Sequence, residues 1–158
     1  MNLTRFLIAG CLTIVLLVTS GCTDSSIHMG AAPSVPLSTT TANSTVERVE
    51  MYHFHGDHQC DSCIAVGDLA EKTVHENFKN ELASGRLVFA HVNYDLPENT
   101  VLATKYNVTG SSLWIGVYDA NGFHKEQDIQ VWYLIDDEEA YFTYLSGIIA
   151  RRLNGDLS

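Results

Sequence analysis

Between residues 46 and 153, apolar side chains switch between the spacing of strands and the spacing of helices. Dense or alternating apolar runs predict strands over 46–54, 86–94 and 113–118, with a fourth inside 123–133. Spacing of three and four residues predicts helices over 63–82, over 98–106 and from about 138 to 152. The predicted order is therefore β-α-β-α-β-β-α.

Residues typical of helix ends and turns support these boundaries. Gly85 ends the first helical pattern, and Pro97 stands near the first turn of the second. Asn121-Gly122 is a two-residue hairpin signal between the third and fourth strands. The acids at 136–139 suit the start of the last helix, where the dipole favours negative charge.

The linking helices predict that the first three strands run parallel and that the hairpin adds an antiparallel fourth strand. The segment 86–94 is almost continuously apolar, which predicts a central strand buried on both faces. The fold class is α/β, a three-layer α/β/α sandwich around a mixed four-stranded sheet.

A different pattern precedes this domain. Residues 6–18 form an apolar run too short for a membrane span, and the small residues 19–21 then lead to Cys22. This resembles the lipobox of prokaryotic lipoproteins, except that Thr19 stands where leucine is usual. The resemblance implies a signal peptide over 1–21 and a lipidated Cys22. An uncleaved anchor and simple secretion are the alternatives.

The segment that follows has too little apolar bulk to offset the entropy lost on ordering, because Ser, Thr, Ala and Pro dominate it. We expect a disordered tether over 22–46, and a folded domain over 47–158. The expected location is the cell membrane, with the domain lipid-anchored and facing outside the cytoplasm.

Composition and missing motifs exclude several functions. Nineteen acidic residues against nine basic ones give a net charge of -10, so no basic face exists to bind nucleic acid. The chain lacks a Gly-rich phosphate loop, a nucleophile elbow and a nicotinamide fingerprint. No organic cofactor is expected.

The candidate chemistry lies between the first strand and the first helix, at Cys60-x-x-Cys63. A cysteine at a helix amino terminus gains the dipole and free amides that stabilise a thiolate. Cys60 is then the attacking residue and Cys63 the resolving one. His55 and His58 can add positive charge or move protons, whereas Asp61 opposes the thiolate and makes the pair more reducing.

Two other interpretations of the pair stay open. Cys60, Cys63, His58 and His55 are thiolate and imidazole donors that suit Zn, Cu or Fe. The cysteines can also form a static disulfide in a non-catalytic interaction domain, although a bridge across so short a loop contributes little stability.

The same residues resemble the thioredoxin superfamily over about 47–154. Within it, the chain looks most like small thioredoxin-like lipoproteins classed as subunits of aromatic-nitro-compound reductases. That resemblance implies a thiol or electron donor acting on a protein thiol, a disulfide or a reductase subunit. The segments that carry it are 54–56, 60–63, 76–78, 93–95, 97–99, 131–132 and 141–145.

The chain departs from the superfamily at Gln59, where tryptophan is usual, and more importantly before the third strand. Thioredoxins carry a cis-proline before the third strand, facing the cysteine pair, and here Ser111-Ser112 occupies that place. In the family this proline shapes the substrate groove and discourages metal binding. Its loss favours the metal alternative, and we expect a trans peptide bond before Ser112.

Overall fold

The computed structural model describes residues 45–158. The predicted signal peptide, Cys22 and nearly all of the predicted tether lie outside these residues. Within 45–158, no helix combines the length and apolar character needed to cross a bilayer.

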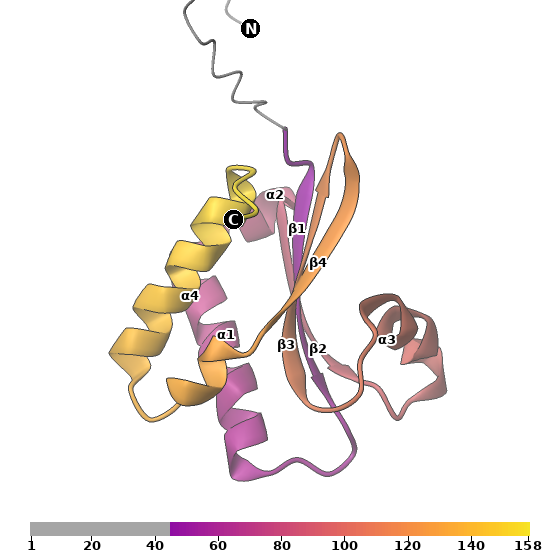
Figure 1. Ribbon diagram of the computed structural model, residues 1–158. Coiled ribbons are helices and arrows are strands. Elements are labelled where there is room, and N and C mark those ends of the chain that lie inside the picture. Colours follow the sequence, from indigo (N-terminus) through magenta and orange to yellow (C-terminus); the bar gives the residue numbers. More distant parts are fainter. Residues whose placement is uncertain (1–44) are drawn as a thin grey trace, which may run out of the picture. The chain divides into compact units, whose positions relative to one another are not determined.

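A four-stranded sheet forms the middle layer, in the order β2-β1-β3-β4 (Figure 1). β1 pairs in parallel with β2 and antiparallel with β3, which in turn pairs antiparallel with β4. The mixed sheet predicted from the sequence is therefore confirmed. The strands are β1 Arg48–His55, β2 Leu87–Asn93, β3 Ser112–Asp119 and β4 Gly122–Asp128.

Helices cover both faces of this sheet. α1 and α4 lie together on one face, and the short α3 lies on the other (Figure 1). Short 3-10 turns, η1 and η2, precede α3 and α4. The helices are α1 Asp61–Asn77, α2 Lys79–Ser84, η1 Pro97–Asn99, α3 Thr100–Tyr106, η2 Gln130–Tyr133 and α4 Glu138–Leu153.

Strand alternation sends side chains to two cores. One face of β1 and β3 packs against α1 and α4, with Met51 and Ile115 almost fully buried. The opposite face packs Phe54 and Tyr106 in a smaller aromatic cluster under α3. This period of two explains why neighbouring β1 residues serve different sides of the molecule.

The prediction that the first three strands run parallel is wrong, because β3 runs antiparallel to β1. A parallel crossover must return the chain along the whole length of the sheet. The seven residues of α3 rise only about 10 Å, whereas the seven residues of β2 span about 23 Å. The chain therefore enters β3 at the end of the sheet where β2 finishes.

Three finer predictions are also corrected. β2 is an edge strand, not a central one, and its apolar run is explained by helices on both of its faces. The hairpin turn is Ala120-Asn121, since Asp119 pairs with Gly122. The predicted helix over 63–82 is interrupted at Phe78, whose φ of -125° separates α1 from α2.

A buried carboxylate lies under the α3 side of the sheet. Glu50 accepts hydrogen bonds from the hydroxyls of Tyr106 at 3.0 Å and Tyr118 at 3.1 Å. Arg48 contacts it at 2.7 Å, and Lys105 lies 3.5 Å away. Two cations and two hydroxyls therefore offset the cost of burying one charge.

We predict that Glu50→Leu lowers the free energy of unfolding by about 2 to 4 kcal/mol, because it leaves the buried Tyr106 hydroxyl and two cations without their acceptor. Urea unfolding of the oxidised protein measures this loss. The matched control is Glu47→Leu at an exposed position of the same segment, with an expected change below about 0.5 kcal/mol. Equal losses in both variants would contradict the assignment.

Candidate functional site

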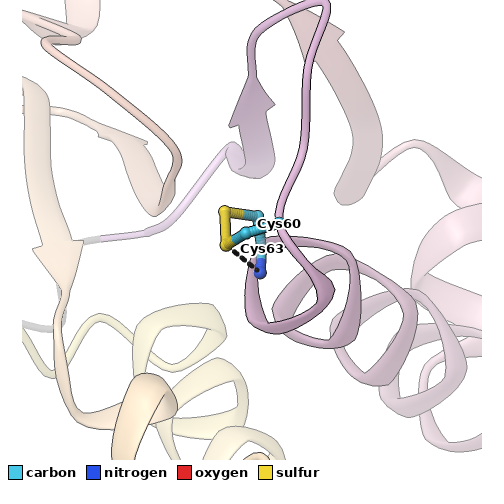
Figure 2. Close-up of a disulfide and its surroundings, with 2 residues drawn as sticks. All are labelled: Cys60 and Cys63. Atoms are coloured by element: carbon cyan, nitrogen blue, oxygen red, sulfur yellow. Dashed lines mark hydrogen bonds between the residues drawn. A yellow bond between two sulfur atoms is a disulfide. The ribbon is translucent and has the colours of Figure 1, made fainter.

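The turn from β1 into α1 positions the two cysteines. Cys60 has extended backbone angles and is the N-cap of α1, whose first residue is Asp61. Its sulfur accepts a hydrogen bond from the backbone amide of Cys63 at 3.2 Å, as Figure 2 shows. A sulfur thus occupies the position where Ser or Asp usually caps a helix, next to the positive end of the helix dipole.

Cys60 and Cys63 form a disulfide, with their Cα atoms 5.0 Å apart (Figure 2). Their surroundings differ, because Cys60 is exposed while Cys63 is half-buried. A nucleophile from solvent reaches Cys60 more easily, and in the reduced form Cys60 is the more accessible thiol. This asymmetry agrees with Cys60 attacking and Cys63 resolving.

Side chains at the end of β2 hold the loop before Cys60. The backbone amide of Asp57 donates to the Asp95 carboxylate at 2.8 Å, and Asn93 Nδ2 donates to the Asp57 carboxylate at 2.7 Å. Gly56 fits because any Cβ there would lie 2.9 Å from Asp95 and 3.0 Å from the Tyr94 hydroxyl. The loop is therefore fixed against β2.

A histidine lies buried where β1 meets α1. His53 is 1% exposed, and its ring packs so closely on Gly67 that a Cβ there would overlap it. Burial lowers the pKa of His53 to about 4, with further lowering by His91 and His55 and an opposing contribution from the backbone of Cys63. The ring is therefore neutral near pH 7, and its Nε2 has no hydrogen-bond partner of normal geometry.

His53 belongs to a group of polar side chains that reaches the surface. Its Nδ1 lies 2.9 Å from His91 Nδ1, across neighbouring parallel strands. His91 Nε2 lies 3.4 Å from Glu71, an exposed carboxylate on α1. These contacts link the buried ring near Cys63 to solvent through two side chains.

The other residues predicted to flank the site are distributed unevenly. His55 stacks on His53 with ring centroids 5.6 Å apart, and its Nδ1 lies 2.9 Å from the Gly56 carbonyl oxygen. His58 and Asp61 are exposed, and Asp61 lies in the first turn of α1. His55 therefore lies beside the buried His53, whereas His58 lies on the surface of the loop.

Ser111 and Ser112 stand where the superfamily has its cis-proline, at the start of β3. Ser112 pairs with Phe54, and its hydroxyl donates to the Gly110 carbonyl and accepts from the Trp114 indole. The peptide bond before it is trans, since residues 45–158 contain no cis peptide bond. No hydrogen bond in this part of the chain joins Ser111 or Ser112 to the cysteines, so their role opposite Cys60 stays a prediction.

The metal alternative lacks a preformed ligand set. Within residues 45–158, no three side chains among His, Cys, Asp and Glu converge as metal ligands do. The disulfide uses both candidate thiolates, and His55 faces a backbone carbonyl. Metal binding by Cys60, Cys63, His58 and His55 therefore stays a prediction for the reduced protein.

The pairing of His53 with His91 was not predicted from the sequence. The two lie 38 positions apart, so no local spacing connects them. A signal was present, however, because both precede the last residue of their strand by two positions. Aligning the ends of two parallel strands would have placed them side by side.

Comparisons with known proteins give structural likeness only. No family model and no curated protein matches the chain. A thioredoxin from Thermus thermophilus is 22% identical over 66% of this chain and 75% of its own, with a TM-score of 0.43. The first two thioredoxin domains of Eps1p from Naumovozyma dairenensis are 23% identical over 73% of this chain, with a TM-score of 0.40. The match spans only 40% of that second structure.

The class of the domain follows from its own topology. The sheet order β2-β1-β3-β4, the disulfide at the start of α1 and the final hairpin and helix define a thioredoxin-like fold. The fold class predicted from the sequence is confirmed. Nothing in these comparisons supports the narrower resemblance to reductase subunits.

We predict that His53 makes the stability of the oxidised protein fall on acidification. Its pKa is about 4 when folded and 6.5 in the ordinary case, so the unfolded chain takes up the proton first as pH falls. The His53 contribution is complete above pH 6.5 and is lost progressively towards pH 4, by on the order of 2 kcal/mol. Urea unfolding at several pH values measures it.

The His53→Phe variant should lose less stability than the wild type over this pH range, whatever its stability at pH 7. His58→Gln, at an exposed loop position, serves as the control and should keep the wild-type profile. An NMR titration of the His53 ring with a midpoint at or above pH 6.5 would refute the prediction.

Proposed function

We propose that this protein is an extracytoplasmic thiol-disulfide oxidoreductase that uses Cys60 and Cys63. The observation that carries the proposal is the exposed Cys60 at the N-cap of α1. Its sulfur forms a disulfide with Cys63 and accepts a hydrogen bond from the Cys63 backbone amide. The amide and the dipole that surround this sulfur are those that stabilise a thiolate once the bond is reduced.

The reaction consumes no cofactor. In the reduced protein the Cys60 thiolate attacks a disulfide sulfur of the partner, and one partner thiolate leaves and takes a proton from solvent. Cys63 then loses its proton and attacks Cys60, which releases the second partner thiol and forms the Cys60–Cys63 disulfide. Two electrons pass to the partner, and the reverse sequence oxidises a partner dithiol.

His53 is suited to assist the second step. With a pKa of about 4 the ring is too weak a base to take a thiol proton, so its contribution is its position against the backbone of Cys63. The contact with His91, which itself lies 3.4 Å from Glu71, holds the ring in that position. We assign His53 a role in the resolving step and none in the first attack.

A static disulfide in a non-catalytic interaction domain is the alternative. The bridge closes a loop with a sequence separation of only 3, so loop entropy gives it little stabilising value. This favours a reactive pair over a structural one. A redox-active pair attacks the disulfide of a partner, whereas a static disulfide does not.

We predict that the reduced Cys63→Ser variant accumulates a mixed disulfide with a model disulfide peptide, because Cys60 attacks and no thiol resolves it. Cys60→Ser should form this adduct about 10-fold more slowly, since its remaining thiol is half-buried. Mass spectrometry of acid-quenched samples measures both. If the two variants react at equal rates, or neither reacts, the proposed roles are wrong.

We further propose that the protein is held at the membrane through Cys22 and hands thiols or electrons to a partner reductase. The support is the sequence pattern before Cys22 and the narrower resemblance of residues 47–154. The tether predicted over 22–46 would keep the domain within reach of partners at the same membrane.

We predict that Cys22→Ser blocks lipidation and signal cleavage together, because the cysteine is both the lipid acceptor and the residue after the cut. Membrane fractionation and mass spectrometry of the mature amino terminus measure the two effects. A variant that is processed and anchored like the wild type would show that Cys22 is not the lipidation site.

A further inference from the structure

Topology gathers four connections at the end of the domain that carries the disulfide. β1 and β2 finish there, β3 begins there and β4 finishes there, as their pairing directions require. α1 and α4 also start at this end (Figure 1). Together with the first residues of α1, α3 and α4, the connections cover residues 56–61, 94–100, 107–111 and 129–139, and we call this surface the disulfide end.

The disulfide end is acidic and contains almost no positive charge. Its four connections hold no lysine or arginine. One cation reaches it from outside, since Lys72 of α1 pairs with Glu138. The exposed carboxylates of the disulfide end are Asp57, Asp61, Asp95, Glu98, Asp136, Asp137, Glu138 and Glu139.

At the opposite end of the domain, arginines accompany the carboxylates, and Arg48 and Arg152 pair with Glu50 and Glu126. Arg48 starts β1, and Arg86 directly precedes β2. Arg151 and Arg152 lie in the last turn of α4. Negative charge is therefore balanced at that end but not at the end that carries the disulfide.

Exposed apolar side chains also concentrate at the disulfide end. Tyr133 and Ile129, between β4 and α4, are 78% and 59% exposed. Leu96 lies in the connection after β2, and Ile64 follows Cys63 directly. Two further large apolar residues are exposed in the described part of the chain. Val101 lies one residue past the 94–100 segment, and Leu157 lies away from the disulfide end. Such a gathering of apolar groups with a polar rim is typical of a protein-binding surface.

A buried, neutral histidine lies behind the same surface. His53 is 1% exposed, and its unpartnered Nε2 sits with the ring against the backbone of Cys63. The surface therefore combines an exposed sulfur, apolar contacts and an acidic rim.

We infer that the disulfide end is a docking surface for a cationic polypeptide segment that carries its cysteines next to lysine or arginine. Charge complementarity selects this occupant, because the carboxylates of the disulfide end attract basic residues and repel acidic ones. The apolar side chains indicate a polypeptide partner over a small cation. The inference rests on the proposed redox function and names the class of partner.

The test uses three disulfide peptides that differ only in the residues beside the cysteines: lysine, serine or glutamate. The full-length protein is first reduced with dithiothreitol and freed of it, so that its own dithiol supplies the two electrons. The rate of peptide reduction is then measured at low and high salt. Each rate is divided by the rate of the same peptide with free dithiothreitol, which removes the effect of the flanking charges on the peptide itself.

We expect the normalised rate for the lysine peptide to exceed that for the glutamate peptide by about 10-fold at low salt. The difference should nearly vanish near 1 M salt, where the Debye length is about 3 Å. Asp95→Asn combined with Glu98→Gln should reduce the preference for lysine and keep the loop, because the asparagine carbonyl can still accept from the Asp57 amide.

The matched control is Glu47→Gln combined with Glu81→Gln, which removes the same charge near the other end of the domain and should keep the preference. Equal normalised rates for the three peptides, or a preference that both double variants reduce alike, would overturn the inference and leave the redox function standing. If no peptide is reduced at all, the proposed function itself fails.

Discussion

The backbone amide of Cys63 donates its hydrogen bond to the sulfur of Cys60, and the rest of the site depends on this contact. It makes one residue both the start of α1 and the exposed end of the disulfide. The sulfur is held at the positive end of the helix dipole before any chemistry takes place. A helix that began one residue earlier or later would lose this arrangement.

Packing between β1 and α1 fixes where that helix begins. The ring of His53 fills the space above Gly67, so the helix can lie close to the central strand only because the glycine has no side chain. The same packing buries His53 and keeps it neutral, with its Nε2 unpaired. The close approach of α1 to β1 and the neutral state of His53 therefore both depend on the packing of His53 on Gly67.

Sequence periodicity predicted the elements of the fold well, because each strand and helix is a local property of its own segment. The cysteine pair was also found, since its spacing and its place before a helix are local signals. What was missed is long-range. The direction of β3 depends on the length of α3 relative to β2, and the edge position of β2 depends on the whole sheet order. The contact of His53 with His91 depends on strand register.

The acidic disulfide end is another property that only topology shows, because its carboxylates come from connections far apart in the sequence. A net charge of -10 alone does not say where the charge lies. In the structure much of it lies at the disulfide end, with arginines near the far end of the strands. The disulfide end can therefore determine both the choice of partner and the reactivity of Cys60.

The most direct test of the central claim is a thiol count on the folded protein in buffers of graded reducing strength, with metal analysis on the same samples. The account predicts that Cys60 and Cys63 appear as two thiols in one reversible step, with no bound metal. A disulfide that resists reduction until the protein unfolds, or thiols that react only after a metal is chelated, would contradict it.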